Sequence, residues 1–256
     1  MKNKSRIISL LSAVIFVLAE ARIFTMIHIT KEPADISLHY LSIQIAALFI
    51  WLSLAIELIL AKKGSRLKVL FNLKDGNLLR IAFIFTLIAD YYLVANGAAD
   101  KLTGMIYFIG TQLFIFLHLF AREENKKRRA ANLITRLSLS VILVAATLAV
   151  LGKNADPLAI VSIIYYANLL TSMIFAPFDK RGGKLLFVGL LLFALCDVNV
   201  GLWVLNDMYQ GFPEGSILYN ILHSGVDLVW IFYLPSQTII PLTVLIKKSN
   251  ITASQI

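Results

Sequence analysis

At 256 residues, with 59% hydrophobic residues, 15% charged residues and a mean hydropathy of +0.79, the chain has too little polar surface to cover a soluble globule of its size. Its net charge of +9 does not indicate a nucleic-acid partner, because the basic residues fall in short clusters between apolar runs, with no interleaved basic and aromatic groove. Cys196 is the only cysteine, which excludes an intrachain disulfide, a thiolate metal site and a redox pair.

Eight apolar runs are long enough to cross a bilayer, since one helical crossing of its roughly 30 Å core needs about 20 apolar residues. The sequence therefore predicts an all-α polytopic membrane protein, a bundle of eight transmembrane helices that forms a single domain over residues 1–256. In chain order we expect the runs near Ile7–Ile27, Leu38–Leu60, Asn77–Asn96, Thr103–Phe120, Leu133–Leu151, Leu158–Ala176, Lys184–Leu205 and Ile217–Ile246.

The first run has a second interpretation. The basic start of the chain, the apolar stretch Ile7–Val17 and the small residues Ala19 and Ala21 also resemble a signal peptide with its cleavage site. We favour a retained membrane span, because cleavage would discard Glu20 and Arg22, two membrane charges that fit the candidate site described below.

Lys and Arg residues between the runs are distributed unequally between the two sides. Only Lys31, Lys101 and Lys153 lie on one side, whereas the other side carries basic clusters such as Lys126–Arg129. By the positive-inside rule we expect both termini in the cytoplasm, which requires an even number of spans, and we expect a bacterial plasma membrane as the location.

The last run, Ile217–Ile246, is too long for one straight crossing, because its roughly 30 residues would extend about 45 Å as a helix. We expect Pro235 and Pro241 to kink this run or to end its spanning part.

Two of the runs carry an aspartate at membrane depth, Asp90 and Asp197. An Asp near the bilayer centre costs roughly 2.5–3.5 kcal/mol, so it is retained where it faces a protein interior or a wet cavity. At about 1.5 Å of rise per residue, three further polar residues fall in the same slab of the membrane, Glu20, Gln112 and Asp227. Arg22 falls about one turn closer to the outside.

Structural roles compete with this interpretation. Asp90 and Asp197 could form structural hydrogen bonds or ion pairs, and Glu20 and Arg22 could neutralise each other. Glu57, near the inner end of the second run, is expected to reach toward Lys62 or Lys63.

Other polar residues are expected to join helices. Gln112 and Asn168 are typical of interhelical hydrogen bonding. His223 and Asp227 are four residues apart on one helical face, but without a second histidine in a ligand motif they make a poor metal site. We therefore expect no metal and no cofactor.

Four short motifs occur in a fixed order along the chain. They are Ala89-Asp90 at the end of an apolar stretch, Gly104 with Phe108 in the next run, Cys196-Asp197 in the seventh run, and Tyr233 with Gln237 in the eighth. In this order and spacing the chain resembles the YhhN-like family of eight-span membrane proteins, the lysoplasmalogenases, from about residue 77 to residue 243.

The resemblance implies an activity. Family members with an assigned activity cleave the vinyl ether bond of lysoplasmalogens to a fatty aldehyde and a glycerophospho-head group, with two aspartates as the proposed catalytic pair. It implies that role for Asp90 and Asp197, with a membrane lipid or lysophospholipid as substrate. The further candidates for substrate binding or for holding water are Glu20, Arg22, Tyr91, Gln112, Asn199 and Asp227. Among them, Arg22 would bind the lipid phosphate.

Hydrolysis of a vinyl ether needs one carboxyl that is protonated, to deliver a proton to carbon, and one that is ionised. The alternative function is a membrane transporter or a small-molecule or lipid-binding receptor, because intramembrane acids also mark proton and ion paths. An inactive relative with the same fold is a third possibility, since Gln112 stands where the family usually has a histidine.

Overall fold

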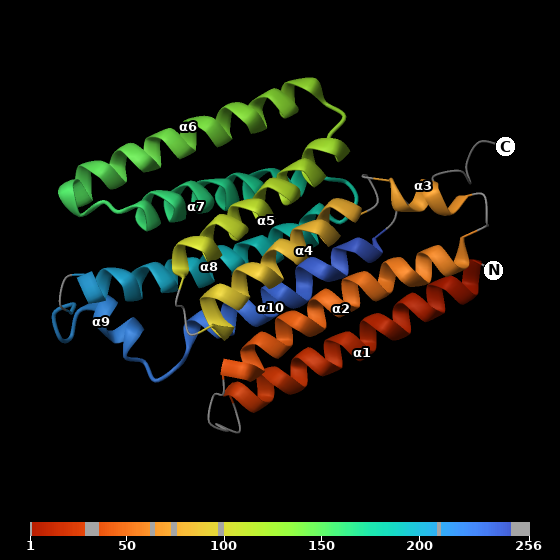
Figure 1. Ribbon diagram of the computed structural model, residues 1–256, viewed down its shortest axis with the longest axis horizontal. Helices are drawn as coiled ribbons and strands as arrows, with labels where there is room; N and C mark the ends of the chain where they lie inside the picture. The colour runs from red at the N-terminus through yellow and green to blue at the C-terminus, as the bar shows by residue number, and fades with distance from the viewer. Residues whose placement is uncertain are drawn as a thin grey trace.

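The computed structural model describes residues 2–28, 36–61, 65–72, 76–96, 100–208 and 211–246, and every regular element in these ranges is helical (Figure 1). Eight of the described helices are long and apolar enough to cross a membrane. The prediction of an all-α polytopic bundle is therefore confirmed. The Lys2 end of the first helix and the Leu242 end of the last long helix lie at the same end of the bundle, as an even number of crossings requires (Figure 1).

Seven of the long helices coincide with the first seven apolar runs. They are α1 (Lys2–His28), α2 (Ile36–Leu60), α4 (Asn77–Asp90) with the π-helical turn η3 (Tyr91–Ala95), α5 (Lys101–Arg122), α6 (Lys126–Leu151), α7 (Pro157–Phe175) and α8 (Gly183–Met208). The shorter elements are α3 (Arg66–Leu70), α9 (Ile217–Leu222), and the one-turn 3₁₀ helices η4 (Gly152–Asn154), η5 (Ala176–Phe178) and η6 (Thr243–Leu245).

The eighth run does not form one long helix, as its length led us to expect, but the break is not at the prolines. The run divides into α9 and α10 (Leu228–Leu242), with the break around Gly225. Gly225 has a φ of +73°, a left-handed conformation that suits glycine, and Asp227 starts the next helix by accepting a hydrogen bond from the Trp230 N–H. Pro235 and Pro241 lie inside α10, so they do not end it where we expected.

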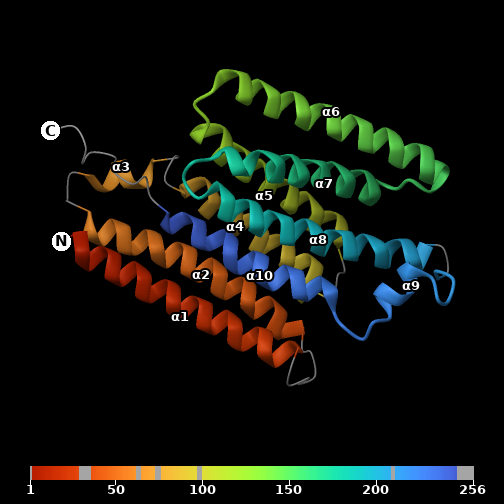
Figure 2. The same ribbon diagram turned by 180° about the vertical axis from the view of Figure 1, so that it is seen from behind.

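Six of the long helices form a closed ring. Around the ring, α2 packs against α4, α4 against α5, α5 against α7, α7 against α8, α8 against α10, and α10 against α2 (Figures 1 and 2). Outside it, α1 packs on α2 and α10, and α6 packs on α7. The side chains that fill the ring are therefore shielded from lipid. A polar side chain costs less free energy there than on the lipid-facing surface.

The peripheral helix α6 is fixed by a buried arginine. Arg136 donates to the side-chain oxygen of Asn168 at 2.7 Å and to Ser172 Oγ at 3.1 Å, both on α7, and its guanidinium lies 4.5 Å from the ring centre of Phe116. Asn168 thus joins two helices, as predicted from the sequence.

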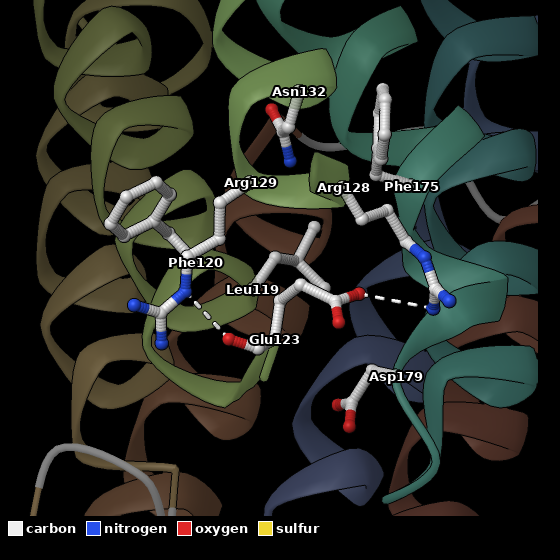
Figure 3. A pocket seen from close by; sticks show the side chains of 8 residues that line it. All are labelled: Leu119, Phe120, Glu123, Arg128, Arg129, Asn132, Phe175 and Asp179. Carbon is white, nitrogen blue, oxygen red and sulfur yellow. Dashed lines mark hydrogen bonds and ion pairs between the residues drawn. The ribbon is translucent and has the colours of Figure 1, made fainter. Parts of the chain in front are cut away.

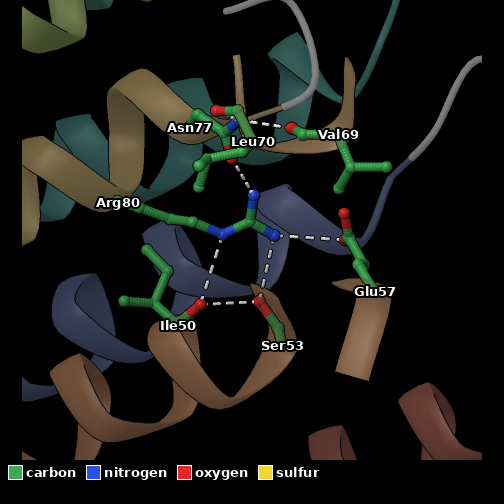
Figure 4. Close-up of polar contacts among 7 residues, drawn as sticks. All are labelled: Ile50, Ser53, Glu57, Val69, Leu70, Asn77 and Arg80. Atoms are coloured by element: carbon green, nitrogen blue, oxygen red, sulfur yellow. Dashed lines mark hydrogen bonds and ion pairs between the residues drawn. The ribbon is translucent and has the colours of Figure 1, made fainter. Parts of the chain in front are cut away.

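A second buried arginine joins the end of α2 to the start of α4. Arg80 is 1% exposed and pairs with Glu57 at 3.1 Å, while it also donates to Ser53 Oγ at 3.2 Å and to the Ile50 carbonyl at 3.3 Å (Figure 4). Asn77 completes the cluster by accepting from the same guanidinium. Glu57 thus forms an ion pair with the neighbouring helix, while Lys62 and Lys63, toward which we expected it to reach, lie outside the described residues.

Two glycines of α8 provide a test of its packing. A Cβ on Gly183 would lie 2.0 Å from the Ala176 carbonyl oxygen, whereas a Cβ on Gly201 would have no atom within 4 Å. We expect Gly183→Ala to destabilise the protein by about 1–3 kcal/mol through overpacking. Gly201→Ala should stabilise it by up to about 1 kcal/mol through helix propensity. Thermal unfolding of the detergent-solubilised variants measures both, and equal melting temperatures would contradict the close approach at Gly183.

Candidate functional site

Asp90 ends α4 inside the helix ring. Its side chain is 2% exposed, and its Oδ2 accepts a hydrogen bond of 2.5 Å from the hydroxyl of Tyr233 on α10. The bond joins residues 143 positions apart in the chain. Asp90 is therefore held by α10, which is separated from α4 by α2 in the ring, so its position depends on closure of the bundle.

The chain widens into a π-helical turn directly after Asp90. Tyr91–Ala95 forms this turn, and the Asn96 N–H donates to the Tyr91 carbonyl at 2.8 Å, five residues back. Single π-turns inside α-helices are rare and are frequent at functional sites. The local backbone thus marks the same position that the buried carboxylate marks.

Asp197 lies on α8, which belongs to the same ring, and is partly buried. Its Oδ2 accepts a hydrogen bond of 2.7 Å from the hydroxyl of Tyr165 on α7. Each of the two aspartates is thus paired with one tyrosine from another helix.

Phenylalanine rings connect the two aspartate–tyrosine pairs. Phe193, one turn before Asp197, has its ring centre 6.4 Å from that of Tyr165 and 5.4 Å from that of Tyr233. Phe108 on α5 contacts Tyr165 at 5.4 Å and Phe193 at 5.7 Å. Both carboxyl groups therefore belong to one interior, lined by an aromatic cluster of Phe108, Tyr165, Phe193 and Tyr233.

Two other predicted residues lie within the ring helices and are buried. Gln112 is 1% exposed, and among the described residues neither its amide nitrogen nor its amide oxygen has a hydrogen-bond partner. The interhelical hydrogen bond predicted for it is therefore absent from the described part of the chain. Asn199 is 7% exposed and donates to the Leu195 carbonyl on its own helix.

Four predicted residues lie apart from the two carboxyl groups or at their edge. Glu20 is buried and accepts from Ser42 on α2, so it does not form the proposed pair with Arg22, which is exposed. Tyr91 is exposed and its ring lies near that of Tyr40. Asp227 is exposed as the N-cap of α10, six residues before the tyrosine that holds Asp90.

Sequence reasoning did not assign the two tyrosines to the site. Tyr233 was part of the motif that carries the family resemblance, and Tyr165 was not singled out. Tyrosines near helix ends are commonly interfacial anchors. The available signal was that a buried membrane aspartate requires a hydrogen-bond donor. A tyrosine can be buried for its apolar ring and still supply its hydroxyl as that donor.

A small pocket at the inner ends of α5, α6 and α7 cannot hold a substrate. Its volume is about 10 Å³, the space of one water molecule. Arg128 and Arg129 both reach Glu123 there, one through its carboxylate at 3.1 Å and one through its backbone carbonyl at 2.6 Å (Figure 3). These contacts link α5 to α6 and are structural.

A larger cavity of about 380 Å³, called the outer cavity below, opens between α8, the loop after α9 and the start of α10, at the end of the bundle opposite the Lys2 end of α1. Its lining includes Trp203, Asp227 and Trp230. Trp230 contacts the ring of Tyr233 at 5.4 Å, so one side chain separates this cavity from the tyrosine that holds Asp90. A volume of this size lies within the range of small-molecule sites.

The arrangement can exchange protons. A low-dielectric interior favours one neutral and one ionised member of a pair of carboxyl groups whose charges interact, and such a pair holds both a proton donor and a proton acceptor.

No family model, curated protein or solved structure matches this chain.

Proposed function

We propose that the protein is a membrane-embedded hydrolase of the lysoplasmalogenase type, which cleaves the vinyl ether bond of a lysolipid through Asp90 and Asp197. The observation that supports the proposal is the pairing of each carboxyl group with a tyrosine hydroxyl inside one helix ring, at 2.5 Å for Asp90 and 2.7 Å for Asp197. The order of motifs that resembles the YhhN-like family supports it independently.

The chemistry requires two steps. In the first, the protonated carboxyl delivers its proton to the vinyl carbon remote from the ether oxygen, which leaves an oxocarbenium ion. In the second, water adds to that ion as the ionised carboxyl accepts its proton, and the resulting hemiacetal breaks down to a fatty aldehyde and an alcohol. The two carboxyl groups supply the donor and the acceptor, as in glycoside cleavage. Tyr165 and Tyr233 hold them in position.

We place both chain termini in the cytoplasm, on the positive-inside argument. In that orientation the buried Arg80 and Arg122 lie at the cytoplasmic ends of their helices, and Asp90, the last residue of α4, lies nearer the outer leaflet. A lysolipid with its head group outside would then present its vinyl ether bond to the carboxyl groups.

The assay compares two lipids that differ in one double bond. We expect the purified protein to release a fatty aldehyde from a lysoplasmalogen and none from the saturated ether analogue, because only the vinyl ether forms an oxocarbenium ion on protonation. Absence of aldehyde from the lysoplasmalogen, with the protein monodisperse and folded, would refute the proposal.

A second candidate function is a proton or solute path through the ring. Gln112 and His118 favour it, since both are buried on α5 and their side-chain polar atoms have no hydrogen-bond partner among the described residues. Intramembrane polar residues of this kind mark such paths. Proton uptake by proteoliposomes in the absence of any lysolipid would favour this candidate over the hydrolase.

A further inference from the structure

The outer cavity has a composition that the proposed hydrolysis does not use. Two indole rings and a carboxylate contribute to its wall, from Trp203 on α8 and from Trp230 and Asp227 at the start of α10. Two aliphatic side chains, Leu222 and Val229, also line the cavity. The protein has three tryptophans in all, so two of the three line this one cavity.

The carboxylate makes the cavity selective for charge. Asp227 accepts the Trp230 N–H at 3.3 Å as the N-cap of α10, which fixes its place at the rim. Among the described residues, ion pairs join Arg80 to Glu57, Arg122 to Asp179 and Arg128 to Glu123, and none of these pairs includes Asp227. An exposed carboxylate without an Arg or Lys partner in the described part of the chain attracts a cation and repels an anion.

The indoles determine which kind of cation fits. A tryptophan face attracts a cation through its ring quadrupole, and cages of aromatic rings are the common protein solution for substituted ammonium groups. Trp230 is held by ring contacts with His39 at 4.0 Å and Tyr233 at 5.4 Å, and Trp203 contacts His223 at 6.2 Å. Rings fixed in this way lose little freedom on binding. A metal ion is disfavoured, because one carboxylate is too few oxygen ligands for it.

We propose that this cavity binds a substituted ammonium group, with its positive charge against Asp227 and its alkyl substituents on Trp203 and Trp230. The group could belong to a small free amine or to a lipid head group. The proposal does not rest on hydrolysis, because binding is measured without turnover and a catalytically inactive protein should bind equally well.

The test measures binding of radiolabelled choline and of lysophosphatidylcholine to the full-length protein in a maltoside detergent, which carries no ammonium group. Asp227→Asn keeps the helix cap and removes the charge. Trp203→Leu and Trp230→Leu remove one ring each, and Trp51→Leu, on the lipid-facing surface of α2, is the matched control. Each indole should be worth about fivefold to thirtyfold in affinity. The Asp227→Asn variant should also bind more weakly, and the control should bind as the parent does.

Competitors distinguish the source of the ammonium group and provide the contradicting outcomes. If lysophosphatidylcholine binds and lysophosphatidylglycerol does not, the group is a lipid head group; if only choline binds, it is a free amine. The proposal is overturned if the neutral isostere of choline, with carbon in place of nitrogen, competes as well as choline does. It is equally overturned if neither ammonium ligand binds, or if the three cavity variants bind like the parent. Melting temperatures and conservative Trp→Phe variants, which should retain part of the affinity, separate loss of the cage from loss of the fold.

Discussion

Replacing either Asp90 or Asp197 by Asn is expected to lower aldehyde release from a lysoplasmalogen by about 10²–10⁴-fold, the usual worth of general acid–base catalysis. Asn keeps the shape of the side chain and its oxygen can still accept the hydroxyl of Tyr233 or Tyr165, so the hydrogen bonds seen in the structure have a substitute. What is lost is the ability to donate and accept a proton. The two variants should therefore be folded and inactive.

The measurement pairs the rate of aldehyde release with the melting temperature. Glu214→Gln, an exposed acid in the loop before α9, is the control and should leave both unchanged. Residual activity above about a tenth of the parent rules a residue out as acid or base, given the expected loss. A large fall in melting temperature with activity retained would instead assign a structural role to that aspartate.

Breaking the buried pair of Arg80 and Glu57 is expected to have the largest effect on stability. Removal of one member of a buried ion pair takes away the charge that compensates the other, which typically costs about 3–5 kcal/mol. Arg80→Met should be at the upper end of that range, because the guanidinium also serves Ser53 and Asn77 (Figure 4). Glu57→Gln should cost less, since Gln can still accept a hydrogen bond.

A double-variant cycle in detergent checks this expectation. When both charges are removed, the protein should be more stable than the sum of the two single losses predicts, by a coupling within about 0.5–3 kcal/mol. Arg66→Met, on the exposed short helix α3, controls for loss of a positive charge near the same end of the bundle. Strictly additive losses would mean that the pair contributes nothing to folding.

Hydropathy predicted the helices well, because the bilayer imposes a length and a composition on every span. Seven runs match a helix. The eighth is interrupted, as its length required, but the break lies at residues 223–227, and both prolines lie inside α10. The break contains Gly225, which has a left-handed backbone, between the polar residues His223 and Asp227.

The aspartates were predictable and their partners were not. A carboxyl group in a membrane-spanning run is rare because its insertion into the bilayer costs free energy, so Asp90 and Asp197 could be identified from the sequence alone. The roles of Tyr165, Tyr233 and Arg80 depend on which helices pack against one another. The sequences of eight apolar helices of similar composition do not reveal these neighbours. The π-turn after Asp90 likewise follows from packing.

The closed ring has a consequence for the biosynthesis of the protein. The ring is completed by α10, the last long helix of the described chain, so Asp90 enters the membrane 143 residues before the tyrosine that holds it. At synthesis rates of about 5–20 residues per second, the carboxyl waits about 7–30 s for its partner. During that interval it carries an insertion penalty of roughly 2.5–3.5 kcal/mol without compensation. The half-made chain is thus the form of this protein that most needs protection by the insertion machinery.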